Sequence, residues 1–167
     1  HITIGDFSFE WLNNLEIESG WEHSTDKGKI VLPKKVQIKN ASGDVVAELS
    51  DYIKVGQKVL VRIGYDGVLN TVFSGYVSDF IPKTPLEILI EDEMWNLKQT
   101  SLTGSAKNET VEGLMSKHFS AYISDVVNVS LGNYYIQGLS QAKILEQLKS
   151  DFGLYSFFRG DTLVVGK

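Results

Sequence analysis

Cysteine is absent from the 167 residues of this sequence, which excludes disulfides, cysteine-ligated zinc sites and thiol nucleophiles. Histidine and proline are scarce, with three residues of each. No uninterrupted apolar run approaches the roughly 18 residues that a transmembrane helix needs, so we expect no membrane insertion. The remaining composition is that of an ordinary globular protein, since 43% of the residues are hydrophobic and 22% are charged.

Patterns that mark catalytic or cofactor sites are also missing. The histidines His1, His23 and His118 are far apart, and no His-Glu-x-x-His pair, Gly-x-Ser-x-Gly elbow, phosphate-binding loop or dinucleotide fingerprint occurs. His118 falls on an apolar helical stripe, where a packed histidine is the simpler interpretation. We therefore predict a protein that is not an enzyme, with no catalytic, cofactor-binding or metal-binding residue and no cofactor.

Three remaining patterns have ordinary structural interpretations. Glu91, Asp92 and Glu93 are consecutive residues at a predicted strand end, so their side chains should diverge instead of converging on a cation. The tripeptide Arg159-Gly160-Asp161 has the composition of a hairpin turn. Tryptophan contributes three residues that could form a sugar platform but fit better as core or interface anchors: Trp11, Trp21 and Trp95.

Negative charge prevails, with 21 acidic and 16 basic side chains and a net charge of −5. An acidic chain lacks the broad positive field on which nucleic-acid affinity usually rests. Basic residues gather in one place, which we interpret as a solvated strand face or a contact for an acidic partner: Lys27, Lys29, Lys34, Lys35 and Lys39.

The first hundred residues have the pattern of antiparallel strands. Apolar and polar residues alternate around positions 15–17, 36–38, 59–63 and 86–90, which places one face of each strand on a core. Asp66-Gly67 predicts a two-residue hairpin turn, and Gly75 inside a long strand predicts a bulge or a sharp bend. These signals favour a small antiparallel β-barrel over residues 1–100.

Residues 101–167 predict a different organisation. The polar stretch Thr100–Ser105 is expected to be a boundary loop. A helix follows, with Asn108 or Thr110 as its cap and an apolar stripe from Val111 to Phe119, and then a strand over Val127–Leu131.

The chain should close with a second helix and a terminal hairpin. Ser140 caps this helix, Gly153 ends it, and the hairpin turns at residues 159–161. The predicted fold class is thus mainly β with α+β: a small antiparallel β-barrel, residues 1–100, followed by a compact α+β domain with two helices, residues 101–167.

Four segments follow one another in the first half, a lead-in with glycine before a strand, a strand containing Phe-Ser-Gly, an apolar strand ending in Asp and a short helix with Leu: Ile53–Tyr65, Val72–Val77, Leu86–Asp92 and Trp95–Lys98. Two helix starts and two terminal strands continue the order: Thr110–Leu114, Leu139–Leu145, Phe152–Phe158 and Thr162–Val165. This order resembles that of phage baseplate hub proteins, namely late control D-type tail proteins and the hub part of type VI secretion spikes. The likeness covers roughly residues 30–167, and family members usually continue into a second barrel.

The resemblance implies a structural subunit of a phage or prophage-derived tail baseplate hub, which connects the tail tube to the spike or tip by ring assembly. Its implied partners are further copies of itself, as a homotrimer, with tail tube and spike or tip proteins, while DNA is only passing cargo. Its implied place is the virion tail, assembled in the bacterial host cytoplasm. Two alternatives remain open at this point: a carbohydrate-binding or adhesion module, and a tail-associated cell-wall hydrolase.

Overall fold

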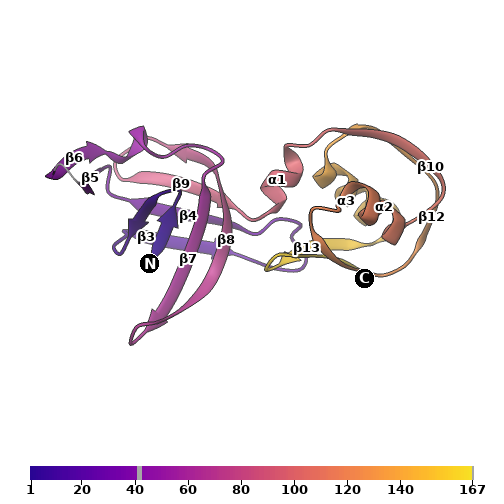
Figure 1. Ribbon diagram of the computed structural model, residues 1–167, viewed down its shortest axis with the longest axis horizontal. Coiled ribbons are helices and arrows are strands. Elements are labelled where there is room, and N and C mark those ends of the chain that lie inside the picture. The colour runs from indigo at the N-terminus through magenta and orange to yellow at the C-terminus, as the bar shows by residue number, and fades with distance from the viewer. Residues whose placement is uncertain (41–42, 167) are drawn as a thin grey trace. The chain divides into compact units, whose positions relative to one another are not determined.

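The computed structural model describes residues 1–40 and 43–166. Internal contacts divide the chain into two compact units (Figure 1). The first unit comprises His1–Glu18 and Lys27–Asp92, and the second comprises Ser19–Asp26 and the chain from Glu93 to the C-terminal end.

The first unit is built on a seven-stranded sheet in which every neighbouring pair is antiparallel. In spatial order its strands are β2 (Phe7–Phe9), β1 (Ile2–Ile4), β7 (Lys58–Tyr65), β8 (Val68–Ile81), β9 (Leu86–Glu91), β4 (Lys27–Leu32) and β3 (Asn14–Glu18). Alternation along β9 buries Leu86, Ile88 and Ile90 while the residues between them stay half-exposed, as the sequence predicts.

This sheet must be curved, because its two edge strands follow each other in the chain. β2 ends at Phe9 and β3 begins at Asn14. Five residue steps span at most about 19 Å, whereas the outer strands of a flat seven-stranded sheet would lie about 29 Å apart. Within residues 1–40 and 43–166, however, β2 and β3 do not pair with each other. The mainly β prediction is therefore confirmed, but a closed barrel is not.

A separate hairpin of β5 (Lys35–Asn40) and β6 (Gly43–Glu48) precedes a short 3-10 helix, η1 (Leu49–Asp51). Residues 41 and 42, between β5 and β6, lie outside the described residues. The core of the first unit consists of buried aliphatic residues and one phenylalanine: Ile2, Ile4, Ile30, Leu32, Leu49, Ile53, Val59, Val61, Phe73, Val77, Leu86, Ile88 and Ile90.

The β7–β8 connection is the predicted two-residue turn. Tyr65 pairs with Val68, and both residues between them have positive φ, 52° at Asp66 and 81° at Gly67. Two positive φ angles match the twist of a right-handed hairpin, which explains the preference for Asp-Gly.

Gly75 is needed for a reason other than the bulge predicted from the sequence. The register shifts of β8 lie on either side of it, opposite Val61/Arg62 and between Val77/Asp79. A Cβ atom at Gly75 would lie 2.0 Å from the backbone oxygen of Glu91. Glycine is therefore required by the close approach of two backbones.

The second unit combines a two-stranded ribbon, a three-stranded sheet and three α-helices. The ribbon pairs β10 (Leu102–Thr110) with β12 (Ser130–Leu139), and the sheet has the order β11 (Ile123–Val126), β14 (Thr162–Gly166), β13 (Tyr155–Arg159). The helices are α1 (Met94–Lys98), α2 (Val111–His118) and α3 (Gln141–Phe152). Leu114, Met115, Ile144, Leu148 and Leu163 lie in its buried core.

Of the two candidates Asn108 and Thr110, Thr110 is the cap of α2, and the predicted cap of α3, Ser140, is confirmed. The hydroxyl of Thr110 accepts a hydrogen bond from the amide of Gly113 at 3.1 Å, and that of Ser140 accepts one from Lys143 at 3.2 Å. Gly153 ends α3 with φ 67°, the left-handed conformation that glycine adopts without strain.

Two predictions for this unit are wrong. The stretch Thr100–Ser105, expected to be a loop, enters β10, whose polar residues pair with β12. The strand expected over Val127–Leu131 is instead the end of β11 at Val126 and the start of β12 at Ser130. Most of the outer face of the ribbon contacts solvent, so β10 and β12 contain many polar and small residues. Such residues do not have the typical composition of strands, and for this reason the sequence did not predict the ribbon.

Candidate assembly surface

The three histidines and the acidic residues do not form a metal site in the part of the chain that the structure describes. Within residues 1–40 and 43–166, no group of three or more His, Asp or Glu side chains could hold a metal ion. The imidazole of His1 lies 2.8 Å from the Ser8 hydroxyl, His23 is exposed and His118 is half-buried on α2. No helix among the described residues is long and apolar enough to cross a membrane.

The acidic run Glu91–Glu93 is part of the structural framework. Asp92 is buried, with 6% of its surface exposed. Glu91 lies opposite Lys27 in the β4–β9 register, and the carboxylate of Glu93 accepts a hydrogen bond from Asn96 at 2.9 Å.

The two other sequence patterns occupy different environments. Arg159 pairs with Thr162 across a tight turn in which Gly160 has φ 60°, so the predicted turn at Arg159-Gly160-Asp161 is confirmed. The tryptophans are not core residues as a group, because Trp11 is 85% exposed and Trp21 is 59% exposed. Trp21 contacts the ring of Tyr155 edge to face at 5.4 Å.

The lysine cluster of the first unit forms ion pairs on the strand surface. Lys29 lies 3.1 Å from Glu16 of β3, and Lys34 lies 3.3 Å from Glu48 of β6. All four side chains are partly exposed, so these pairs contribute little to stability.

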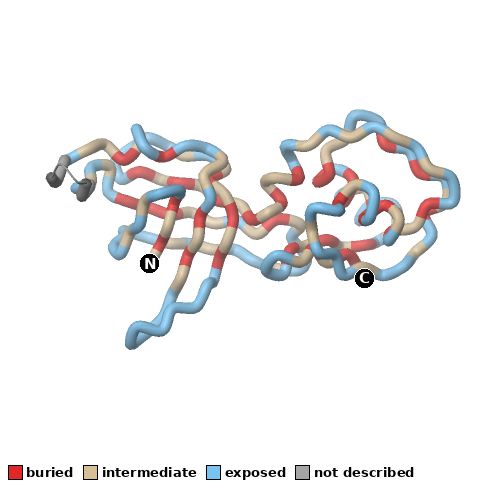
Figure 2. The backbone as a smooth tube through the Cα atoms, in the orientation of Figure 1, coloured by how far each residue is buried: buried red, intermediate tan, exposed pale blue. Residues whose placement is uncertain are grey.

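An exposed hairpin arm, residues 63–72, is the most prominent apolar surface of the first unit. β1 pairs with β7 only up to Val61, and β9 pairs with β8 only from Tyr76 onward. Between these limits β7 and β8 pair only with each other among the described residues, and every residue of the arm is exposed (Figure 2).

One face of the arm is apolar. Tyr65 pairs directly with Val68, so both side chains project from the same face, and Ile63 lies two residues along the strand on that face. Their exposed fractions are 88% for Tyr65, 66% for Val68 and 50% for Ile63. Large exposed apolar side chains that gather in one patch mark interaction sites.

Distinct backbone features mark the tip, the middle and the base of the arm. Its tip has the tight turn at Asp66-Gly67, and a register shift lies at its base between Val61 and Arg62. A Cβ atom at Gly64 would lie 1.7 Å from the carbonyl oxygen of Val68, so only glycine fits there. The turn and the close approach at Gly64 thus fix how the two strands of the arm pair.

A second apolar feature lies at the open edge of the first sheet. A hollow of about 520 Å³ is lined by Phe7 and Phe9 of β2, by Trp11 and by Val36. β2 is an edge strand with no second strand partner among the described residues. Aromatic side chains beside an unpaired strand edge are suited to association with another chain.

The sequence did not predict the exposed arm, because the alternation of apolar and polar residues along β7 predicts that its apolar face is buried. The alternating pattern groups Ile63 with Val59 and Val61, which are buried, yet Ile63 lies beyond the last residue of β7 that pairs with β1. The signal that could have found it is the length of the β7 and β8 runs compared with the short β1 strand.

No family model and no curated protein matches the sequence. Solved structures do share its fold. The 43 kDa tail protein of prophage MuSo2 from Shewanella oneidensis is 19% identical with a TM-score of 0.70, and the similarity covers 99% of this chain and 53% of that protein. A tail protein from Neisseria meningitidis MC58 is 17% identical with a TM-score of 0.62, covering 99% of this chain and 50% of that one.

A third similar structure is the E. coli c3393 protein, a component of the type VI secretion system described as similar to the bacteriophage T4 tail proteins gp27 and gp5. It is 13% identical with a TM-score of 0.57, covering 99% of this chain and 48% of that one. The chain spans about half the length of these proteins. These neighbours agree with the resemblance found in the sequence: the chain has the fold of phage tail proteins and of a type VI secretion component.

Proposed function

We propose that the chain is a structural subunit of a phage or prophage-derived tail baseplate hub, which joins the tail tube to the spike or tip by shape and packing and not by catalysis. The observation that carries this proposal is the fold shared with two tail proteins over 99% of the chain. The protein would act in the virion tail after assembly in the cytoplasm of the bacterial host.

The proposed assembly is a homotrimeric ring that contacts tube and spike or tip proteins. The apolar face of the arm, formed by Ile63, Tyr65 and Val68, supports self-association because burying it against another copy would remove large apolar side chains from water. The unpaired edge at β2 supports it as well, since neighbouring subunits can cover such edges. DNA would pass as cargo, which the acidic first hundred residues would not retain.

The test is the absolute mass in solution, measured by light scattering over a wide concentration range. The proposal predicts a reversible rise from the 18.6 kDa monomer towards three times that mass. A mass that stays at the monomer value at every concentration would contradict ring assembly through this chain.

A further inference from the structure

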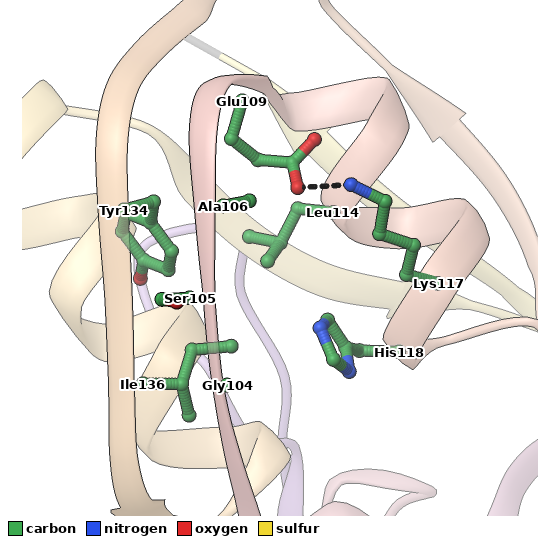
Figure 3. Close-up of a pocket in the computed structure, with 9 residues that line it drawn as sticks. All are labelled: Gly104, Ser105, Ala106, Glu109, Leu114, Lys117, His118, Tyr134 and Ile136. Carbon is green, nitrogen blue, oxygen red and sulfur yellow. Dashed lines mark hydrogen bonds and ion pairs between the residues drawn. The ribbon is translucent and has the colours of Figure 1, made fainter.

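The second unit contains two hollows whose walls offer different groups to a ligand. The larger, of about 320 Å³, lies between the inner face of the β10–β12 ribbon and α2, and the Glu109 and Lys117 side chains in its lining neutralise each other (Figure 3). The smaller, of about 230 Å³, lies between α3, β13 and the loop residues Trp21, Glu22 and Ser24, which belong to the same unit. We call it the α3–β13 hollow.

Two buried residues form the closed end of the α3–β13 hollow. Leu145 of α3 is 2% exposed, and Ser156, on the buried face of β13, is 5% exposed. The Ser156 hydroxyl has no hydrogen-bond partner among the described residues. Because buried polar groups nearly always have a partner, an unpaired hydroxyl beside a hollow marks a place where a polar group from outside the chain can bind.

The open end of the hollow has an aromatic wall. Trp21 is 59% exposed and contacts Tyr155 edge to face, with the ring centres 5.4 Å apart. The ammonium of Lys149 lies 4.7 Å from the centre of the Tyr155 ring and donates a hydrogen bond to the carbonyl oxygen of Glu22 at 3.2 Å. These contacts hold the loop against α3 and β13, so the indole of Trp21 is fixed in place while more than half of its surface contacts water.

The hollow presents no strong charge of either sign. Lys149 already bonds to the Glu22 carbonyl, and the carboxylate of Glu146 pairs with Lys143 at 2.6 Å. The Glu22 side chain is exposed at the rim, where water screens it, so it attracts a cation only weakly. A neutral occupant therefore fits the lining better than an anion or a cation does.

We infer that the α3–β13 hollow binds a neutral sugar unit of a glycan. A sugar ring has a face of C–H groups that can lie on an aromatic ring, and hydroxyls that both donate and accept hydrogen bonds. Its C–H face would lie on Trp21, and its hydroxyls would bond to the side chains of Ser24 and Ser156. An aromatic wall with a few placed polar groups is the usual design of a small-ligand site.

This inference goes beyond the proposed structural role and does not depend on it. All residues that line the hollow belong to the second unit, whereas the arm and the β2 edge belong to the first. A subunit that assembles by packing can therefore carry this site without change to its assembly surfaces.

The test is an NMR titration of the isotopically labelled full chain with neutral trisaccharides of glucose, galactose, mannose or N-acetylglucosamine. We expect the indole N–H resonance of Trp21 and the amide resonances of Ser156 and Lys149 to shift, with a dissociation constant of about 1 mM for the best sugar. The Trp21 resonance is the indole signal that disappears in Trp21→Phe. Comparing the N-acetylated probe with the plain hexoses identifies the class of glycan.

Tryptophan variants locate the binding. Trp21→Ala should weaken the binding of the best sugar by about tenfold or more, because the aromatic wall is lost. Trp11→Ala is the matched control and should leave the affinity unchanged, since Trp11 is 85% exposed, lies in the first unit and does not line the hollow. Trp21→Phe, which keeps an aromatic ring, should retain more of the affinity than Trp21→Ala does.

Ser156→Ala separates sugar binding from folding. Removing a buried hydroxyl that has no partner should leave the melting temperature unchanged or raise it. The same substitution should weaken sugar binding by about fivefold, because one hydrogen bond to the sugar is lost. Ser124→Ala, at an exposed position of β11 outside the hollow, should change neither property.

Several results would overturn the inference. One is the absence of any shift of the Trp21 resonance with every neutral probe at about ten times the expected dissociation constant. Others are an equal loss of affinity in Trp11→Ala and Trp21→Ala, or full affinity in Ser156→Ala. Tighter binding of a cationic glucosamine trimer or a sialylated trisaccharide than of every neutral probe would show that charge is recognised instead. The mass measurement above reports only association of subunits, so failure of either proposal is recognised separately.

Discussion

Glu109 is a carboxylate that the fold buries beside the first turn of α2. It accepts hydrogen bonds from Lys117 at 2.5 Å and from the amide of Thr110 at 3.2 Å. A Cβ atom at Gly113 would lie 2.3 Å from a Glu109 carboxylate oxygen, so the glycine leaves room for this side chain. The hydrogen bond from Lys117 lowers the pKa of Glu109 below its ordinary value of 4.5, against the opposing effect of burial.

Replacing Glu109 with Gln should therefore destabilise the second unit at neutral pH. We expect a loss of about 1 kcal/mol, since one partner of the ion pair is largely exposed. Because the folded pKa is lowered, the stabilisation is present above about pH 4.5 and is lost as pH falls through the folded pKa. Urea unfolding at pH 7 and in acid would measure both effects.

Glu146→Gln is the matched control for this variant. Glu146 pairs with Lys143 at 2.6 Å, but both side chains are at least half-exposed, so the substitution should change stability by less than about 0.5 kcal/mol. Equal effects of the two substitutions at pH 7 would contradict a special role for Glu109.

At the scale of the element, β8 joins the core of the first sheet to the arm. Phe73 and Val77 are buried along it, and residues 63–72 of the hairpin extend past the neighbouring strands. Between them, Gly75 lies against the backbone of Glu91 and Asp92. Proper pairing of β8 and β9 therefore depends on the absence of a side chain at one position.

Gly75→Ala should destabilise the first unit by about 3 kcal/mol or more, because the new methyl group would meet backbone atoms that cannot rotate away. Gly104→Ala is the control, since its Cβ has free space and its φ is not positive, and we expect it to be neutral or slightly stabilising. Denaturant midpoints of the two variants provide the comparison. A Gly75→Ala protein as stable as wild type would show that the strands can separate without cost.

At the scale of the whole molecule, the arm is the part of the fold that we propose for self-association. Its exposed apolar residues do not contribute to the core of the first unit, so their replacement separates association from stability. Polar substitutions in a surface used only for assembly should leave the stability of the monomer unchanged. They should weaken only the association between copies.

The double substitution Tyr65→Ser and Val68→Ser should keep the free energy of unfolding within about 0.5 kcal/mol of wild type. Self-association, followed by light scattering, should weaken by about tenfold or more because two large apolar side chains no longer leave water. Ile123→Ser, which changes a 72% exposed residue of β11, serves as the control and should not alter the mass. Association that survives the double substitution would move the interface away from the arm.

Much of the local structure was predictable because its causes are local. The Asp66-Gly67 turn, the caps at Thr110 and Ser140 and the left-handed Gly153 follow from the backbone preferences of these residues. Alternation in β9 and the apolar stripes of α2 and α3 follow from the same periodicity that packs them. Sequence alone therefore determined a mainly β chain with capped helices.

Tertiary structure decided what depends on strand neighbours. Whether Ile63 is buried or exposed depends on where β1 ends, and whether β10 is a strand depends on its pairing with β12. Curvature of the first sheet follows from the order of its strands along the chain. Burial and pairing are properties of contacts between distant residues, and for this reason only the folded chain shows which apolar faces remain free for a partner.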